Sequence, residues 1–170
     1  GQLWGNPQYD WQAMKAENYT WWKKRFHKLY SMVDIVRIDH FRGFDEYFSI
    51  PADADSAKAG HWEKGPGMDL FNAIHWQLGN VNIIAEDLGL MTDGVRRLVR
   101  DSGCPNMKVL QFAIDPSDIG AANDYWPHNY NSHCVVYTGT HDNETVAGWF
   151  AGLEKDARKQ VRDYLGDYYT

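Results

Sequence analysis

The stretch Asp34-Ile35-Val36-Arg37-Ile38-Asp39-His40-Phe41-Arg42-Gly43 decides the fold, because it begins as an apolar strand and ends in charged residues. Side chains alternate along a strand, so Arg37 and Asp39 share one face. A cation so close to a carboxylate favours its ionised form. Gly43 then permits a sharp turn after the strand. The stretch therefore predicts a strand that carries an ionised carboxylate at its carboxyl end.

Two more apolar runs end in the same way. Residues 82–89 pass from Asn-Ile-Ile-Ala into Glu86, and residues 135–143 pass from Val-Val-Tyr into Asp142. A single Arg-x-Asp at a strand end is usually an ordinary ion pair. Three strand ends that each carry a carboxylate instead indicate the rim of an active site.

The chain alternates helical and strand-like patterns, which predicts an α/β fold with parallel strands joined by crossover helices. The expected helices cover residues 19–32, 69–78, a segment capped by Thr92 and stopped by Gly103, a segment after Asn143, and residues 154–168. The run that ends in Glu86 is expected to form a strand over residues 81–86, and one further strand is expected over residues 107–115. Residues 1–10, 49–67 and 116–132 are expected to be loops, the second of them a lid. Lys23, Lys24, Arg25 and Lys28 are expected to form a solvated helix face.

Two architectures fit this alternation, an open doubly wound sheet and a (β/α)8 TIM barrel, and in both the chemistry lies beyond the carboxyl ends of the strands. No glycine-rich phosphate-binding motif follows a strand, so nucleotide binding loses its main support. We favour the barrel. Because a complete barrel needs roughly 250 residues, the 170 residues are expected to be a single segment of a catalytic barrel domain, inactive alone and lacking its N-terminal and C-terminal parts.

Composition narrows the classes of partner. The formal net charge of −6 argues against nucleic acid or an anionic membrane surface. Two lone cysteines, Cys104 and Cys134, have no metal-ligand spacing and favour a reduced, cytoplasmic setting. Aromatic residues make up 15% of the chain. Several of them, including Trp4 and Trp62, occur in predicted loops, where flat rings suit the apolar faces of sugars.

The first chemical interpretation is glycoside chemistry, in which two carboxyl groups protonate the leaving oxygen and stabilise the sugar carbon. Asp39 beside Arg37 suits the nucleophile. Glu86 closes an apolar strand, whose surroundings favour the protonated form that an acid requires. Asp142, flanked by His141 and Asn143, is expected to bind sugar hydroxyls. No metal and no cofactor is expected for this chemistry.

Two other interpretations remain open. A metal-dependent hydrolase would use Asp39, His40, Glu86, His141 and Asp142 as ligands. Adjacent strand residues face opposite ways, however, so Asp39 and His40 are poorly placed to bind one ion. A sugar-binding barrel without turnover would explain the aromatic residues but has no need of three carboxylates.

The same residues resemble the 4-alpha-glucanotransferases (amylomaltase, disproportionating enzyme) of glycoside hydrolase family 77, relatives of the alpha-amylases. The likeness runs nearly end to end and is highly specific as a set. It is carried by residues 1–7 (GQLWGNP), 37–43 (RIDHFRG), 84–89 (IAEDLG), 107–112 (MKVLQF), 127–130 (PHNY) and 137–143 (YTGTHDN).

This resemblance implies a (β/α)8 barrel in which Asp39, Glu86 and Asp142 end the fourth, fifth and seventh strands. It implies that Asp39 is the nucleophile, Glu86 the acid/base and Asp142 the stabiliser of the transition state. Substrate contacts are expected from Arg37, His141, Trp62, Asn143 and Trp4. Residues 51–67 resemble a mobile loop over the acceptor cleft. The implied partners are an alpha-1,4-glucan donor and acceptor, with an amylase-like hydrolase as the alternative activity.

Overall fold

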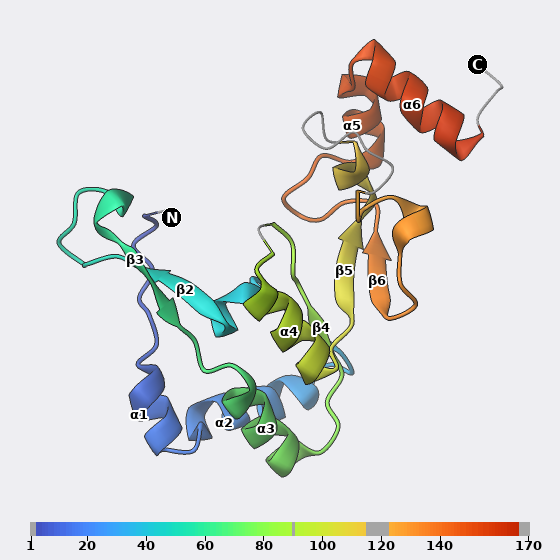
Figure 1. Cartoon of the computed structure of the whole chain (residues 1–170). Coiled ribbons are helices and arrows are strands. Elements are labelled where there is room, and N and C mark those ends of the chain that lie inside the picture. Colours follow the sequence, from blue (N-terminus) through green and yellow to red (C-terminus); the bar gives the residue numbers. More distant parts are fainter. Residues whose placement is uncertain (1–2, 90, 115–122, 167–170) are drawn as a thin grey trace. The chain divides into compact units, whose positions relative to one another are not determined.

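The computed structural model describes residues 3–89, 91–114 and 123–166, which form two compact units, Gly1–Asn106 and Met107–Thr170 (Figure 1). The first unit contains α1 (Trp11–Ala16), α2 (Thr20–Tyr30), β1 (Val36–Ile38), β2 (Glu46–Ser49), β3 (His61–Lys64), α3 (Met68–Leu78), β4 (Ile83–Ala85) and α4 (Asp93–Ser102). It also contains two short 3-10 helices, η1 (Phe41–Phe44) and η2 (Ala57–Ala59). The second unit contains β5 (Asn106–Val109), which starts at the last residue of the first unit, then η3 (Leu110–Ala113), η4 (Pro127–Asn129), β6 (Cys134–Tyr137), α5 (Val146–Gly152) and α6 (Lys155–Leu165).

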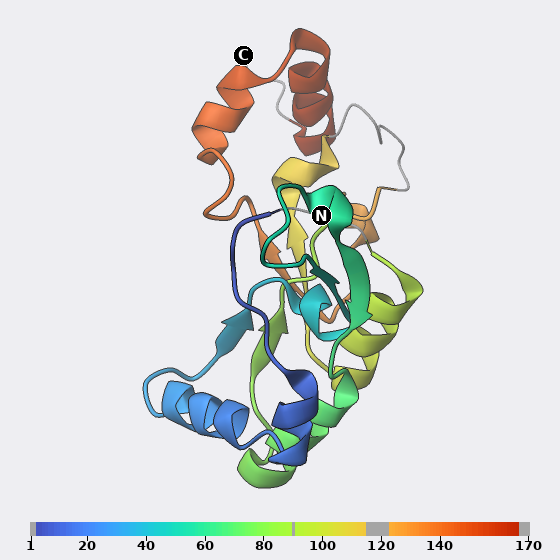
Figure 2. The same ribbon diagram turned by 90° about the vertical axis from the view of Figure 1, so that its left-hand side faces the viewer.

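Parallel strands β1 and β4 form the frame of the first unit. Their register pairs Val36 with Ile83 and Ile38 with Ala85, and Ala85 is also paired with Asn106 in the parallel contact between β4 and β5. Helix α3 leads into β4 and packs against α2, and the two helices lie side by side in Figures 1 and 2. The parallel pairing and the crossover helix confirm the predicted α/β class.

The core of the first unit is aromatic and lies directly behind the turn that follows Asp39. The rings of Phe41 and Phe71 stack with their centroids 5.1 Å apart, and Phe44 meets Phe71 edge-on at 5.4 Å. Trp22 of α2 adds a further edge contact to Phe44 at 5.6 Å. Because η1 contributes both Phe41 and Phe44, packing of the core fixes the chain immediately after β1.

Truncation of Phe71 tests this core. Phe71 is 0% exposed, so Phe71→Ala is expected to lower the free energy of unfolding by about 3–5 kcal/mol. Trp76 lies on the same helix but is 82% exposed, so Trp76→Ala is expected to change it by less than about 0.5 kcal/mol. Urea unfolding of both variants measures the contrast. Equal losses would show that α3 does not bury Phe71 as described.

Helix boundaries follow the predicted signals closely. The Thr92 hydroxyl accepts a hydrogen bond from Val95 N at 3.3 Å, and α4 ends at Gly103 with a φ of 68°. Helix α2 matches the prediction for residues 19–32 within two residues at each end. Its predicted solvated face is partly wrong, because Lys23 is only 6% exposed. Helix α1 was not predicted, although Asp10 accepts a capping bond from Ala13 N at 2.9 Å.

The predicted lid over residues 49–67 is wrong in its secondary structure. Strands β2 and β3 form an antiparallel hairpin that pairs Glu46 with Lys64 and Phe48 with Trp62. Its backbone is closed by Gly65 N, which donates to Asp45 O at 2.8 Å. Residues 61–64 form a strand because they pair with residues 46–49, more than ten positions earlier in the chain, although the segment has no regular pattern in the sequence.

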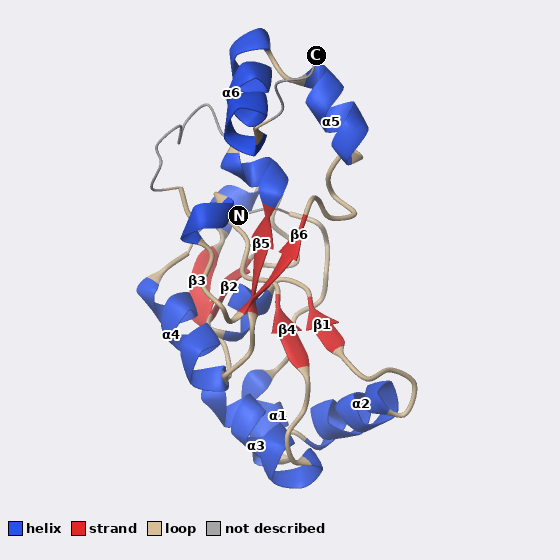
Figure 3. Ribbon diagram, turned by 90° about the vertical axis from the view of Figure 1, so that its right-hand side faces the viewer, coloured by secondary structure: helices blue, strands red, loops and turns tan. Residues whose placement is uncertain are grey.

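In the second unit, β5 and β6 are hydrogen-bonded neighbours that run the same way (Figure 3). The predicted strand 107–115 is too long, since η3 begins at Leu110. Gln111 N there donates to Thr138 O at 3.3 Å. The predicted loop 116–132 lies partly outside the described residues, as does the end of the helix predicted for 154–168. No helix within the described ranges is long and apolar enough to cross a bilayer.

Candidate active site

Asp39 and Glu86 follow directly on two neighbouring parallel strands. Glu86 N donates to Ile38 O at 3.0 Å, and Phe41 N donates to Glu86 O at 2.9 Å. The ladder between β1 and β4 therefore continues past the last paired residues and sets the two carboxylate-bearing residues beside each other. This shared strand edge is the placement that the sequence predicted; the roles of the two residues stay predictions.

Arg37 and Asp39 form the ion pair that strand alternation predicted. Arg37 Nη2 lies 2.8 Å from Asp39 Oδ1. The Asp39 side chain is 65% exposed, so the carboxylate can meet a ligand, whereas Arg37 is mostly covered at 28%. The guanidinium thus orients the Asp39 carboxylate while leaving its second oxygen accessible.

The surroundings of the Glu86 carboxyl group differ from the apolar ones expected. Its Oε2 accepts a hydrogen bond from His40 N at 2.6 Å, and its Oε1 accepts one from Leu88 N at 2.8 Å. The strand itself is apolar, but the side chain turns to backbone donors at the strand end. These donors fix the orientation of the carboxyl group.

The third predicted carboxylate lies in a compact turn of the second unit. Asn143 Oδ1 accepts bonds from Thr140 N at 2.8 Å and from Thr140 Oγ1 at 2.9 Å, and Asp142 N donates to Thr140 Oγ1 at 3.2 Å. His141 Nε2 lies 3.4 Å from Asp142 Oδ2, and both side chains are exposed. Because the amide oxygen of Asn143 holds the turn, a sugar contact from this residue would come from its amide nitrogen.

Buried Gln111 supports the same turn from beneath. Its Nε2 donates to Glu144 O at 2.9 Å, and a Cβ at position 139 would lie 2.6 Å from that nitrogen. Glycine at 139 is therefore the residue that lets the Gln111 amide lie against the turn. The convergence of Asp142 with Asp39 and Glu86 on one sugar stays a prediction.

Trp62 and Trp4 take different positions in the first unit. Trp62 lies on β3 with its ring 48% exposed, packs edge-on against Phe48 at 5.3 Å, and carries the Arg42 guanidinium 4.3 Å from its ring centroid. Arg42 belongs to η1, so this contact ties the hairpin to the turn after Asp39. A sugar could stack only on the ring face that Arg42 leaves open. Trp4 is 72% exposed and lies before α1 in a segment without regular secondary structure.

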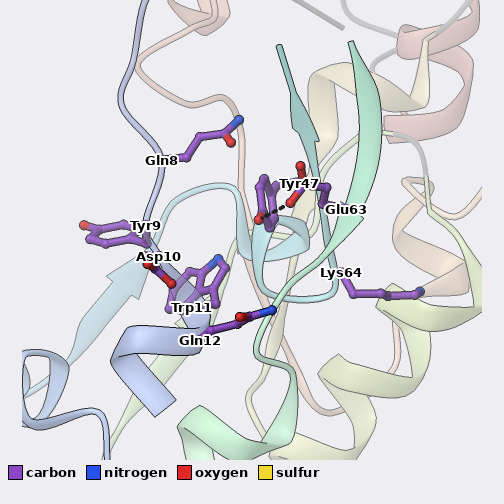
Figure 4. A pocket seen from close by; sticks show the side chains of 8 residues that line it. All are labelled: Gln8, Tyr9, Asp10, Trp11, Gln12, Tyr47, Glu63 and Lys64. Atoms are coloured by element: carbon purple, nitrogen blue, oxygen red, sulfur yellow. Dashed lines mark hydrogen bonds between the residues drawn. The ribbon is translucent and has the colours of Figure 1, made fainter. Parts of the chain in front are cut away.

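A surface hollow of about 420 Å³ lies between the segment that leads into α1 and the β2–β3 hairpin (Figure 4). Its wall includes the hydrogen bond from Tyr47 Oη to Glu63 Oε2 at 2.8 Å. Burial, with help from this bond, raises the pKa of Tyr47 to about 12, so the phenol keeps its proton. The lining residues are Gln8, Tyr9, Asp10, Trp11, Gln12, Tyr47, Glu63 and Lys64. None of these is a predicted site residue.

The side chains of the described residues do not support the interpretation as a metal-dependent hydrolase. Across residues 3–89, 91–114 and 123–166, no group of three or more His, Cys, Asp and Glu side chains gathers as an ion would require. Asp39 forms an ion pair with Arg37, and the Glu86 carboxyl group accepts hydrogen bonds from two backbone N–H groups.

The sequence model of one enzyme family, described as 4-alpha-glucanotransferase, matches residues 1–169. The chain belongs to this family. Its relatives include the 4-alpha-glucanotransferase of Streptococcus pneumoniae, 51% identical over 99% of this chain. The chloroplastic/amyloplastic enzyme of Arabidopsis thaliana is 46% identical over 97% of the chain. Among solved structures, an amylomaltase from Streptococcus agalactiae in complex with acarbose superposes with a TM-score of 0.93 at 38% identity and covers the whole chain.

The chain spans about a third of the length of these family members. It covers 32% of the Streptococcus pneumoniae enzyme, 28% of the Arabidopsis enzyme and 34% of the amylomaltase structure. The match of the family model to residues 1–169 confirms the resemblance drawn from the motifs along nearly the whole chain.

Two sets of contacts in this member of the family were not predicted by any pattern in the sequence. The backbone donors to Glu86 come from His40, which is 46 positions away, and from Leu88. The Arg42–Trp62 contact joins two elements whose pairing was not predicted. The histidine after Asp39 was considered only as a metal ligand, whereas its backbone is the part that contacts Glu86.

Proposed function

We propose that the chain is the catalytic segment of a longer 4-alpha-glucanotransferase, which transfers an alpha-1,4-glucan segment to the 4-hydroxyl of an acceptor glucan or glucose. The observation that carries the proposal is the pair Asp39 and Glu86 on adjacent strand ends, with Arg37 2.8 Å from Asp39. A retaining reaction needs such a pair, one carboxylate exposed to attack the sugar and one held to move a proton. Family membership supports the same activity.

In the first stage, Asp39 attacks the anomeric carbon of the donor while Glu86 gives its proton to the departing glycosidic oxygen. The carbon–oxygen bond to the leaving chain breaks as the bond to Asp39 Oδ forms, which leaves a covalent glucosyl intermediate. Arg37 holds the Asp39 carboxylate in orientation for this attack through the ion pair at 2.8 Å. Asp142 would stabilise the positive charge that develops on the sugar ring.

In the second stage, the 4-hydroxyl of an acceptor glucan replaces water. Glu86, now a carboxylate, takes the hydroxyl proton, the new glycosidic bond forms and the bond to Asp39 breaks. Transfer prevails over hydrolysis when the acceptor is held in position, because an oriented hydroxyl has a very high effective concentration. We propose that Trp62, His141, Asn143 and Trp4 contribute such sugar contacts.

We also propose that β1, β4 and the parallel strands after them belong to a (β/α)8 barrel of one catalytic domain. Parallel pairing, crossover helices and carboxylates at the strand ends support this architecture. A cytoplasmic location remains part of the proposal. Both cysteines are free, and burial raises the pKa of the Cys104 thiol, which keeps it unreactive. The plastid names of the plant relatives show that the family is not confined to one compartment.

Incubation of the complete protein with maltotriose tests the activity. Transfer is expected to give glucose together with oligosaccharides longer than maltotriose, separated by chromatography. Glucose and maltose alone would indicate an amylase-like hydrolase, and unchanged maltotriose would indicate a binding protein. Either of those results would overturn the proposed transfer.

Trp62→Ala tests the acceptor contact. Loss of one stacked ring face is expected to raise the acceptor KM about tenfold, since burying an aromatic side chain stabilises by about 1.5–3 kcal/mol. The kcat should change less, because the ring does not touch the reacting atoms. Trp62→Phe should recover part of the loss, and Trp76→Ala on α3 serves as the matched control. Equal acceptor KM values for Trp62→Ala and the control would remove Trp62 from the site.

A further inference from the structure

The backbone N, the backbone O and both carboxyl oxygens of Glu86 each form a hydrogen bond, and three of these four bonds are made with one short segment. Its backbone N donates to Ile38 O at 3.0 Å, and its backbone O accepts from Phe41 N at 2.9 Å. Its Oε2 accepts from His40 N at 2.6 Å, while Leu88 N completes the set at Oε1. The segment 38–41 thus brackets Glu86, and Asp39 lies in the middle of that segment.

The backbone conformation of His40 makes this bracket possible. His40 adopts φ 51° and ψ 53°, a left-handed conformation that few residues other than glycine take. In an extended strand, consecutive N–H groups point to opposite sides. A left-handed residue reorients the next peptide, so that two successive N–H groups can reach the same neighbouring residue. The N–H of His40 accordingly meets the Glu86 carboxylate, and the N–H of Phe41 meets the backbone carbonyl oxygen of Glu86.

We propose that the left-handed turn at His40 is a positioning device for the acid/base carboxylate, which it ties to the segment that carries the nucleophile. The inference rests on the proposed glucanotransferase function and adds a positioning residue to it. His40 acts here through its backbone N–H and its conformation, so its imidazole is not needed for this role.

The turn at His40 suits the role of Glu86, because this carboxyl group acts in both stages of the proposed reaction. In the second stage Glu86 acts as a base, and the N–H bond from His40 to Oε2 fixes the orientation of its carboxyl group. In the first stage the proton occupies a lone pair that neither backbone donor uses, since each carboxyl oxygen has two. Because Asp39 and the donor are consecutive residues, the nucleophile and the acid/base keep one relative orientation through both stages.

Two substitutions at position 40 separate the backbone from the imidazole. Both His40→Asn and His40→Val remove the ring, but Asn tolerates the left-handed conformation and the branched Val side chain does not. We expect kcat for maltotriose disproportionation to be about tenfold or more lower in His40→Val than in His40→Asn, with similar KM. Equal kcat values in the two variants would overturn the proposal.

An ester in place of the residue-40 amide, introduced by semisynthesis, covers the case in which His40→Val fails to fold. The ester keeps the histidine side chain and removes the N–H donor. We expect kcat to fall about tenfold or more at unchanged KM, because the carboxyl group of Glu86 loses the donor that orients it. An unchanged kcat would overturn the positioning role. The proposed function itself would fail differently, by substantial activity in Asp39→Asn.

Discussion

Replacing Asp39 by Asn in the complete protein is expected to lower kcat for transfer from maltotriose by at least about 10⁴-fold, because the amide cannot form the covalent intermediate. The substitution keeps the size of the side chain, and the exposed position of Asp39 leaves the fold undisturbed. Chromatography of the products against time measures the loss.

Asp34→Asn is the matched control for this experiment. Asp34 is exposed and precedes the same strand, so the identical chemical change there should leave kcat within about twofold, as expected for a surface site. If Asp39→Asn kept more than a few per cent of the activity of that control, the role of nucleophile would belong to another residue.

Glu86→Gln is expected to lower kcat on maltotriose by about 10³-fold, the size of a general acid–base contribution. The amide oxygen can accept only one of the two N–H bonds from His40 and Leu88, because the amide nitrogen that replaces the other oxygen is a donor, so part of the loss reflects a carboxamide that is held less firmly. It cannot give a proton to a glycosidic oxygen or take one from an acceptor.

A donor whose leaving group needs no proton sharpens this second prediction. With maltotriosyl fluoride, Glu86→Gln should complete the first stage and then stall, so that a maltotriosyl adduct accumulates on the peptide that contains Asp39. Peptide mass spectrometry detects the adduct, and Glu17→Gln, at an exposed carboxylate after α1, is the control that should turn over normally. An adduct on any other peptide would contradict the assignment of Asp39 as nucleophile, and equal turnover by both variants would contradict the assignment of Glu86 as acid/base.

Local rules predicted those parts of the molecule that depend on neighbours in the sequence. Strand alternation placed Arg37 and Asp39 on one face, and the structure pairs them at 2.8 Å. Thr92 and Gly103 marked the ends of α4 because capping needs only the residues at the helix ends. The carboxylates at the ends of β1 and β4 were found because parallel strands bring their carboxyl ends to one edge.

The parts that were missed depend on distant partners. The β2–β3 hairpin pairs Glu46 with Lys64 across a segment that looks irregular by itself. Lys23 is buried although the charged residues Lys24 and Arg25 follow it directly, since tertiary packing and not local pattern decides which face of α2 is covered. The donor to Glu86 comes from a residue 46 positions away in a left-handed conformation that no sequence pattern indicated.

The most direct test of the account is a crystal structure of the complete Glu86→Gln protein with the maltotriosyl group trapped from the fluoride. We expect a covalent bond from Asp39 to the anomeric carbon, the carboxamide at position 86 about 5–5.5 Å from the Asp39 carboxyl group, and Asp142 in contact with the same sugar ring. A sugar bound elsewhere, or Asp142 away from the ring that Asp39 holds, would contradict the convergence of the three carboxylates.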